Sequence, residues 1–407
     1  MKIDFLFSAE LKKLFQIYNK NKEDNIRIVG GAVRNSFLKK DISDIDLATK
    51  FRISDSIKIL KENNIKFIPT GIKHGTITAI INKKTFEITT LRSDKNCDGR
   101  FADVEFVTSY IEDAKRRDFT INALFLDEKG QIFDYFNGIS DLSRGLIKFI
   151  NEPEIRIRED YLRILRFFRF FSYYGKKLDF KSLKESIKAN KNLKDLSADR
   201  VRNEFLKIIL AKNNQNLLKT LNIFNKFNFS NVLFNAKLDI QNYQNLLTLE
   251  DKLNIVFDIK IKFFILLNQF SNLEQVCNNL NFSKKDKNYI LELQKYQIVN
   301  FSISKIALIK LLYKFDKILI TDFLKINLIY QNLPDISQFN KLKLRTLEQD
   351  LPKFILNGND LLKIEVKPKE IGRGLQKLQE IWIESEFKIN KNDLLKEILW
   401  RNPPRDP

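Results

Sequence analysis

Histidine and cysteine are almost absent from this chain of 407 residues. The only histidine is His74, and the two cysteines, Cys97 and Cys277, lie far apart in the sequence. Metal sites built on nitrogen or sulfur need several such ligands at close spacing, so a multi-histidine metal site is excluded and no disulfide framework is indicated. Two isolated cysteines suit a reducing compartment, and we expect a cytoplasmic protein.

Long apolar runs are also missing. The most apolar stretch, 255–270, is interrupted by Asp258, Lys260 and Lys262 and does not reach the length of a membrane-spanning helix. The N-terminus has an early acid, Asp4, and no apolar segment of the kind found in signal peptides. We therefore expect no membrane partner.

Glycine and proline are scarce as well, and acidic residues are outnumbered by basic ones. With 12 Gly and 8 Pro, little in the sequence interrupts helices. The chain has 51 acidic residues against 71 Lys and Arg, a net charge of +20, which favours a polyanionic partner if the charge gathers on one face. Nucleic acid is the natural candidate.

The apolar patterns change character near residue 150. Before it, strand-like runs alternate with helix-like ones and include a hairpin at 76–91, whereas helical spacing dominates afterwards. An amphipathic helix is expected at 1–20. These patterns predict an α+β fold in which a small, mostly antiparallel sheet with helices is followed by an all-α remainder, with boundaries that give the segments 1–144, 145–212, 213–333 and 334–407.

Paired glycines and paired aspartates make the first candidate site. Gly30 and Gly31 follow a strand-like run and lead through Arg34 into a helix, so backbone N–H groups there could hold a phosphate. Asp44 and Asp46 lie two residues apart on a strand-like segment and point the same way, so together they could hold a divalent metal. Taken alone, the paired glycines are most simply explained as a tight turn, and the paired aspartates as a solvated strand end. The combination favours a site for a triphosphate and Mg²⁺.

The string from Arg116 to Leu124 is the most specific in the chain. If it turns helically, Asp118 and Asn122 lie one turn apart and offer an acceptor and an amide to the hydroxyls of a ribose. The simpler interpretation is a helix start with Asp118 as the cap and the arginines, Arg116 and Arg117, in solvent.

The stretch from Glu159 to Arg166 is expected to open a helix with Asp160 and Arg163 on one face. Cytosine and adenine both present an amine donor beside an unprotonated ring nitrogen, whereas guanine and uracil present a carbonyl beside an N–H. An aspartate that accepts from the amine and an arginine that donates to the ring nitrogen would therefore select C and A. The simpler interpretation is an ion pair between Glu159 and Arg163, one helical turn apart.

Taken together, these motifs resemble those of class II tRNA CCA-adding enzymes and their bacterial poly(A) polymerase relatives, over essentially the whole chain. The strings that carry the resemblance are Val29-Gly30-Gly31-Ala32-Val33-Arg34, Asp44-Ile45-Asp46, Arg116-Arg117-Asp118-Phe119-Thr120-Ile121-Asn122-Ala123-Leu124 and Glu159-Asp160-Tyr161-Leu162-Arg163. The resemblance implies a nucleotidyltransferase head (palm) at 1–144, a helical neck with a nucleotide-selecting helix at 145–212, a helical body at 213–333 and an RNA-binding tail at 334–407.

The resemblance also implies the reaction and its residues. The 3′-hydroxyl of a tRNA acceptor end would attack CTP or ATP in two-metal phosphoryl transfer, with no protein partner required. Asp44 and Asp46 would be catalytic and hold Mg²⁺. The nucleotide-binding residues would be Gly30, Gly31, Arg34, Arg92, Arg117, Asp118, Asn122, Asp160, Arg163 and Arg166.

The chain departs from the family pattern at several positions. Asn35 stands where the family commonly has Asp, and Asp199 stands where Glu is usual. The polar segment 94–100, expected to be a mobile loop, continues as Gly-Arg-Phe-Ala at 99–102 where the family often has Gly-Arg-Arg-Pro. Glu87 is either a third carboxylate of the site or an acid on a half-exposed strand, and His74 is expected to be structural.

Three alternatives stay open. A poly(A) polymerase would use the same head, and an enzyme that adds only A or only CC would use the same motifs. A non-catalytic RNA-binding protein would also be basic and helical, but it would have no reason to keep Asp44 and Asp46 beside the paired glycines.

Overall fold

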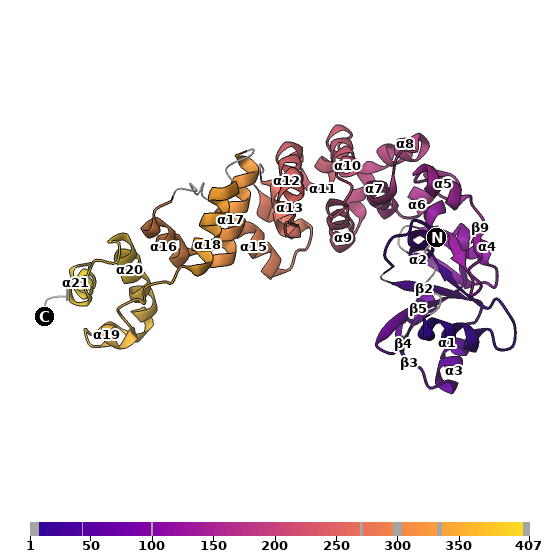
Figure 1. The fold of residues 1–407 in the computed structure, drawn as a ribbon, viewed down its shortest axis with the longest axis horizontal. Coiled ribbons are helices and arrows are strands. Elements are labelled where there is room, and N and C mark those ends of the chain that lie inside the picture. Colours follow the sequence, from indigo (N-terminus) through magenta and orange to yellow (C-terminus); the bar gives the residue numbers. More distant parts are fainter. Residues whose placement is uncertain are drawn as a thin grey trace. The chain divides into compact units, whose positions relative to one another are not determined.

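The computed structural model describes residues 8–42, 44–98, 101–268, 272–295, 303–331 and 336–401 (Figure 1). Every strand within these ranges belongs to the N-terminal third of the chain. The strands are β1 (Ile26–Val29), β2 (Ile45–Thr49), β3 (Lys66–Gly71), β4 (Thr76–Ile81), β5 (Lys84–Thr90), β6 (Arg92–Asp98), β7 (Phe101–Phe106), β8 (Leu124–Leu126) and β9 (Ile132–Asp134).

Seven of these strands form one sheet, in the order β3-β4-β5-β2-β1-β8-β9, and β6 pairs with β7 in a separate ribbon. Every neighbouring pair in the large sheet is antiparallel except β2 and β5. The hairpin between β4 and β5 turns at Asn82 and Lys83, whose φ angles of 48° and 66° suit a tight two-residue turn. The prediction of a small, mostly antiparallel sheet is confirmed.

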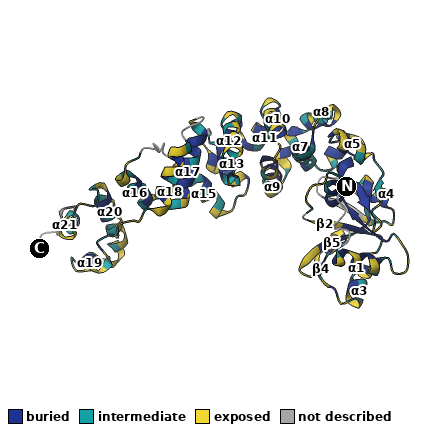
Figure 2. Cartoon of the chain, viewed as in Figure 1, coloured by how far each residue is buried: buried dark blue, intermediate teal, exposed yellow. Residues whose placement is uncertain are grey.

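The two faces of the large sheet pack into different cores. Ile28 joins Leu11 of α1 (Ala9–Tyr18) and Leu60 of α3 (Ile53–Glu62) on one face. Val29, the next residue, packs on the opposite face with Ala114 of α4 (Tyr110–Lys115). This alternation is the period of two expected for a strand covered on both sides, and Figure 2 shows the buried residues running through the sheet.

The rest of the described chain is helical, as predicted. The helices that follow α4 are η3 (Thr120–Asn122), α5 (Gly138–Arg144), α6 (Pro153–Glu159), α7 (Leu162–Tyr174), α8 (Phe180–Lys188), η4 (Asn190–Asp195), α9 (Ala198–Ile209), α10 (Asn214–Lys226), α11 (Phe229–Phe234), α12 (Ile240–Leu253), α13 (Ile259–Leu267), α14 (Leu273–Asn279), α15 (Lys284–Gln294), α16 (Lys305–Lys314), α17 (Lys317–Tyr330), α18 (Ile336–Glu348), α19 (Gly358–Leu362), η5 (Pro368–Glu370), α20 (Ile371–Glu384) and α21 (Lys391–Arg401). Two short elements precede them, α2 (Gly31–Phe37) and η2 (Ile72–His74). In the part of the chain that the structure describes, no helix has both the length and the apolar character that crossing a membrane requires.

Tertiary contacts divide the chain into two compact units. The first contains the described residues up to Ile240 together with 272–283, and the second contains the described residues of 241–268 and 284–401. The first unit holds the sheet and α1 to α11, and an aromatic core joins its helices, with the Phe168 ring 4.9 Å from that of Phe224 and 5.1 Å from that of Phe229. The finer division into head, neck, body and tail stays a prediction.

The structure corrects three local expectations. Helix α1 begins at Ala9 and ends at Tyr18, while residues 1–7 lie outside the described ranges. The segment expected to be a mobile loop is instead strand β6, paired with β7, although Gly99 and Arg100 are not described. Strands in a two-stranded ribbon pair through backbone groups, and this pairing does not require the apolar alternation from which strands are predicted.

The third correction concerns the helix expected to open at Glu159. Glu159 instead ends α6, Asp160 is extended with φ −160° and ψ 106°, and α7 begins at Leu162. The Asp160 carboxylate accepts a hydrogen bond from the backbone N–H of Leu162 at 3.1 Å. A short polar side chain that bonds to the backbone in this way competes with helix continuation and starts the next helix.

Candidate active site

A glycine turn with a positive φ joins β1 to α2. Gly30 has φ 74° and ψ −119°, a conformation that side-chain-bearing residues rarely adopt. A Cβ atom built on Gly30 would lie 3.5 Å from Nη1 of Arg117 and 3.6 Å from the carbonyl oxygen of Asn122. The Gly30 N–H already donates to the carbonyl of Leu124 at 3.0 Å, so the predicted phosphate cradle cannot use that N–H. Both distances are ordinary van der Waals contacts, so what the glycine provides is the positive φ of the turn.

Asp46 lies on the face of the sheet that packs against α4. It pairs with Val29 on β1 and with Glu87 on β5, so the two carboxylates are neighbours across the parallel strands. Asp46 is exposed to solvent, but the protein around it takes away part of its hydration, which raises its pKa; Glu87 and Asp44 raise this pKa further, and Arg117 acts in the opposite direction. Asp44 is exposed and directly precedes β2.

The donor chemistry at this strand end fits a hard cation. Carboxylate oxygens are the ligands that Mg²⁺ prefers, and mutual repulsion among Asp46, Glu87 and Asp44 is what a bound cation would relieve. Within the described residues no three His, Cys, Asp or Glu side chains are grouped closely enough to hold a metal by themselves. Mg²⁺ usually takes one or two carboxylates and completes its shell with water and substrate phosphates, so this arrangement suits Mg²⁺ bound together with a nucleotide.

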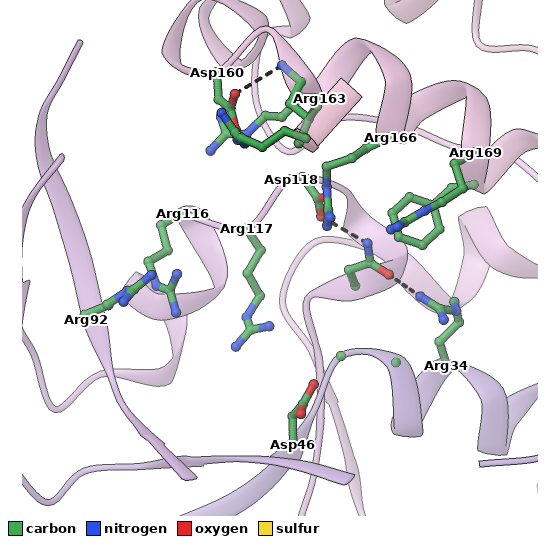
Figure 3. A pocket seen from close by; sticks show the side chains of 16 residues that line it. Arg34, Asp46, Arg92, Arg116, Arg117, Asp118, Asp160, Arg163, Arg166 and Arg169 are labelled. Carbon is green, nitrogen blue, oxygen red and sulfur yellow. Dashed lines mark hydrogen bonds and ion pairs between the residues drawn. The ribbon is translucent and has the colours of Figure 1, made fainter. Parts of the chain in front are cut away.

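A cavity of about 600 Å³ opens above the glycine turn and Asp46 (Figure 3). Eight arginines and three aspartates line it, so its wall is strongly positive. The lining residues are Gly30, Gly31, Arg34, Asp46, Arg92, Arg116, Arg117, Asp118, Asn122, Asp160, Leu162, Arg163, Arg166, Arg169, Phe170 and Arg200. All belong to the first unit. Such a cavity suits a small polyanion that also carries polar groups.

One buried carboxylate fixes two of the arginines. Asp113 on α4 is 1% exposed and pairs with Arg116 at 2.8 Å and with Arg117 at 2.9 Å. Burial alone would raise the pKa of Asp113, but the two guanidinium groups outweigh burial and lower it. Because the carboxylate stays ionised, it fixes both arginines, and both still line the cavity.

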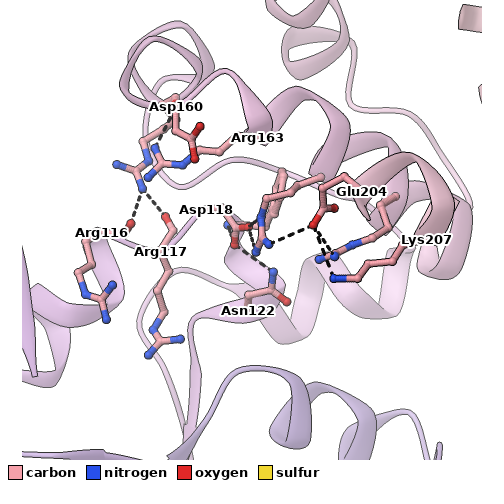
Figure 4. Close-up of polar contacts among 12 residues, drawn as sticks. Arg116, Arg117, Asp118, Asn122, Asp160, Arg163, Glu204 and Lys207 are labelled. Atoms are coloured by element: carbon pink, nitrogen blue, oxygen red, sulfur yellow. Dashed lines mark hydrogen bonds and ion pairs between the residues drawn. The ribbon is translucent and has the colours of Figure 1, made fainter. Parts of the chain in front are cut away.

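Asp118 and Asn122 meet across the short turn η3 (Figure 4). Asn122 Nδ2 donates to Asp118 Oδ1 at 3.0 Å, and Arg166 Nε of α7 donates to Asp118 Oδ2 at 2.6 Å. Burial opposes ionisation of Asp118, yet Arg166, Asn122 and the N–H of Phe119 lower its pKa to about 2. Asp118 and Asn122 were predicted to lie one helical turn apart on one face; they do lie together, but a single 3₁₀ turn rather than an α-helix brings them there, and they bond to each other.

Arg34 continues this network. It donates to Oδ1 of Asn122 and, at 3.0 Å, to the hydroxyl of Tyr174. It also donates to Asn35 Oδ1 at 3.1 Å, and the Tyr174 hydroxyl donates to the same oxygen at 3.2 Å. Asn35 thus supplies an acceptor that orients Arg34, a role that needs an oxygen but no negative charge.

Asp160 and Arg163 both line the cavity, but each has another partner. Asp160 Oδ2 pairs with Arg200 of α9 at 2.7 Å, and Arg163 forms an ion pair with Glu159 and donates to the carbonyl of Arg156 at 2.8 Å. The simpler interpretation, an ion pair between Glu159 and Arg163, is thus correct, and it coexists with the placement of Asp160 and Arg163 at the cavity.

The cavity brings together every nucleotide-binding residue that the sequence predicted, together with Asp46. Asp44 does not line it. Sequence reasoning missed Arg116, Arg169 and Arg200 as lining residues. Arg169 has a sequence signal, since it continues the three-residue spacing of Arg163 and Arg166 along α7, whereas the contribution of Arg200 depends on how α9 packs on α7 and has no local signal.

Known proteins resemble this chain at the level of sequence. Residues 26–148 match the family described as the Poly A polymerase head domain. The human CCA tRNA nucleotidyltransferase 1, mitochondrial, is 32% identical over 428 residues, which covers 97% of this chain and 90% of the relative. The CCA-adding enzyme of Ligilactobacillus salivarius strain UCC118 is 31% identical over 400 residues, 95% and 87% of the two chains.

Solved structures share the fold. The Bacillus stearothermophilus CCA-adding enzyme in complex with CTP superposes with a TM-score of 0.76 at 21% identity, covering 97% of this chain and 98% of the other. The Thermotoga maritima CCA-adding enzyme complexed with tRNA gives 0.62 at 21% identity and covers 98% of each chain. With near-complete relatives above 30% identity, this chain belongs to the family of CCA-adding tRNA nucleotidyltransferases and is a nucleotidyltransferase.

Proposed function

We propose that this chain adds C, C and A to the 3′ end of tRNA from CTP and ATP, with protein side chains in place of a nucleic acid template. The observation that carries the proposal is the cavity in which eight arginines surround Asp46 and the Asp118–Asn122 pair. Nucleoside triphosphates are small polyanions with a ribose and a base, and the cavity offers groups suited to each part. The names of the relatives support the same activity.

In this reaction the RNA 3′-hydroxyl attacks the α-phosphorus of the nucleotide, the bond to the β-phosphate breaks, and pyrophosphate leaves. Asp44 and Asp46 are the residues that would hold two Mg²⁺, which when bound lower the pKa of the attacking hydroxyl and neutralise the triphosphate. Arg117 would contact the phosphates, and its ion pair with Asp113 and its position next to Gly30 support this role. Its fixed guanidinium requires little reorganisation as negative charge develops.

The ribose would lie against Asp118 and Asn122. Asp118 stays ionised at neutral pH because its pKa is about 2. Each carboxylate oxygen of Asp118 already has two donors, Asn122 and the N–H of Phe119 at Oδ1 and two nitrogens of Arg166 at Oδ2. The Asn122 amide donates one N–H to Asp118 and keeps a second, which can donate to a ribose hydroxyl. A preference for ribonucleotides over deoxyribonucleotides follows from this contact.

The base would be read by Asp160 and Arg163. Arg200 holds the carboxylate of Asp160 at 2.7 Å, and Glu159 holds the guanidinium of Arg163, so both groups have fixed directions. The Asp160 carboxylate can accept from the exocyclic amine of C or A, and Arg163 can donate to the adjacent ring nitrogen. With G or U these contacts would set acceptor against acceptor and donor against donor, which such a site rejects strongly.

The test is incorporation of each labelled nucleotide separately into tRNA that lacks CCA. Asp46→Asn is expected to abolish incorporation, while Asp195→Asn, an exposed carboxylate of the same unit, leaves it unchanged. Unchanged incorporation in Asp44→Ala combined with Asp46→Ala would overturn the catalytic assignment and favour a non-catalytic RNA-binding protein. Asp160→Ala and Arg163→Ala are expected to admit UTP and GTP as well as to slow the reaction, and slower reaction with intact selectivity would overturn the base-reading assignment.

The same assay separates the other members of this class. Long A tracts on unrelated RNA would identify a poly(A) polymerase, and products that stop after CC or that require a CC end would identify a partial enzyme. We further propose that the chain acts in the cytoplasm without a protein partner. Because similar enzymes include mitochondrial ones, fractionation of cells that express the tagged chain tests the compartment.

A further inference from the structure

A buried arginine on α6, Arg156, contacts residues that line the cavity but does not line it itself. Arg156 is 5% exposed, and its Nη2 donates to the carbonyl oxygens of Arg116 at 2.5 Å and of Arg117 at 2.6 Å. Arg116 and Arg117, labelled in Figure 4, are the two residues whose side chains Asp113 directs to the cavity wall. Arg156 therefore holds the backbone from which both side chains extend.

These carbonyls need such a partner. Arg116 is the C-cap of α4, and the last carbonyls of a helix have no partner within it. The next carbonyl, that of Asp118, accepts from the N–H of Ile150 at 3.0 Å. Three consecutive carbonyls are thus held by groups from outside the turn, two of them by the single guanidinium of Arg156. The position of Asp118 in the cavity depends on the same backbone.

The other end of the Arg156 guanidinium reaches the base-reading residues. Its Nη1 donates to Oε2 of Glu159, and the same oxygen accepts from Arg163. Arg163 also donates to the backbone carbonyl of Arg156 at 2.8 Å. A continuous set of contacts therefore runs from Arg163 through Glu159 and Arg156 to the turn that carries Arg117.

We propose that Arg156 is a positioning residue that couples base selection at Arg163 to the placement of Arg117 and Asp118. The proposal rests on the proposed function. When the correct base binds Arg163, the shared carboxylate of Glu159 and the guanidinium of Arg156 keep the turn that carries Arg117 in its productive position. A base that pulls Arg163 away disturbs Glu159 and, through Arg156, the turn at Arg116 and Arg117.

The forked guanidinium is essential to this coupling. Arg156 uses Nη1 for Glu159 and Nη2 for both carbonyls, whereas a lysine offers one compact ammonium on a chain that ends earlier. Arg156→Lys keeps the charge and loses the simultaneous contacts. Because a displacement of about 1 Å in a reacting group can cost on the order of 100-fold in rate, the loss is expected in kcat more than in KM.

The matched control lies two residues further along the same helix. Arg158 is 72% exposed at its side chain and pairs with Glu154 at 2.7 Å, so Arg158→Lys makes the same chemical change away from the cavity. For Arg156→Lys we expect kcat/KM for CTP to fall by about 10 to 100-fold, and that for UTP by less than about 3-fold, so that selectivity drops. Arg158→Lys should leave all these values and the melting temperature unchanged.

A second variant tests the link from its other end. Glu159→Gln leaves the carbonyl contacts of Arg156 in place but removes the charge shared with Arg163. If Arg156 acts through Glu159, combining Glu159→Gln with Arg156→Lys will reduce selectivity no further than the worse single change, whereas independent effects multiply.

The outcomes separate this inference from the proposed function. Wild-type protein that adds neither C nor A to tRNA contradicts the proposed function. If the wild type is active and selective, an equal fall for all four nucleotides in Arg156→Lys, or multiplied effects in the double variant, overturns the coupling and leaves the proposed function intact. A selective loss for CTP and ATP with non-multiplied effects supports it.

Discussion

The ion pair between Asp118 and Arg166 gives the most quantitative prediction. Asp118 is 8% exposed, and its pKa is about 2 against an ordinary 3.8. A difference of about two pKa units corresponds to about 2 to 3 kcal/mol by which folding favours the ionised form. Asp118→Asn removes this contribution and leaves Arg166 with Glu204 at 3.9 Å. For a unit of this size the loss should lower the melting temperature by about 5 to 10 °C at pH 7.

The pH dependence identifies the cause. Because the folded pKa lies below the ordinary value, the contribution is complete above about pH 5 and is lost as pH falls from about 4 towards 2. The assay is thermal melting of wild type and Asp118→Asn at pH 7 and at pH 3, with Asp195→Asn as the exposed control. The gap between wild type and Asp118→Asn should shrink by roughly half at pH 3. A gap below 1 °C at pH 7, or one that does not change with pH, would show that the Asp118–Arg166 ion pair does not stabilise the fold.

Three further predictions concern other residues of the first unit. Gly30→Ala places a Cβ at φ 74° and should cost about 1 to 2 kcal/mol of stability and raise KM for CTP; an unchanged melting temperature would show that the turn is not strained. Asp46→Asn should abolish incorporation while the melting temperature stays equal or rises, because partial loss of hydration and Glu87 raise the pKa of this carboxyl and ionisation there opposes folding; a lower melting temperature contradicts this. Phe168→Ala removes a fully buried ring that packs on Phe224 and Phe229. It should lower the free energy of unfolding, measured with urea, by about 3 to 5 kcal/mol. A smaller loss would show that the core collapses into the space left by the ring.

Local patterns in the sequence predicted those parts of the fold that local chemistry decides. The hairpin at β4 and β5 carries its own turn at Asn82 and Lys83, and the change to helices after residue 150 follows from apolar spacing. The break at Asp160 was missed because a run of helix-forming residues conceals one side chain that bonds to the backbone of Leu162. Strand β6 was missed because its residue types carry no alternating apolar pattern.

The sequence predicted which residues belong to the candidate site better than it predicted the contacts that these residues make. Motif spacing indicated Asp118, Asn122 and Arg163, and all three line the cavity. Their partners come from elements distant in the sequence: Arg166 reaches Asp118 across 48 positions, and Arg200 reaches Asp160 across 40. Such pairings depend on how α7 and α9 pack, which a single sequence does not encode in any local pattern.

Sequencing the 3′ end of the product tests most directly whether this chain adds CCA to tRNA. Purified protein should be given tRNA lacking CCA together with CTP, ATP, UTP and GTP, and the extended ends should be sequenced. We expect the addition of C, C and A, followed by a stop, with UTP and GTP excluded. Runs of A, incorporation of U or G at rates comparable with C, or no extension at all would contradict it.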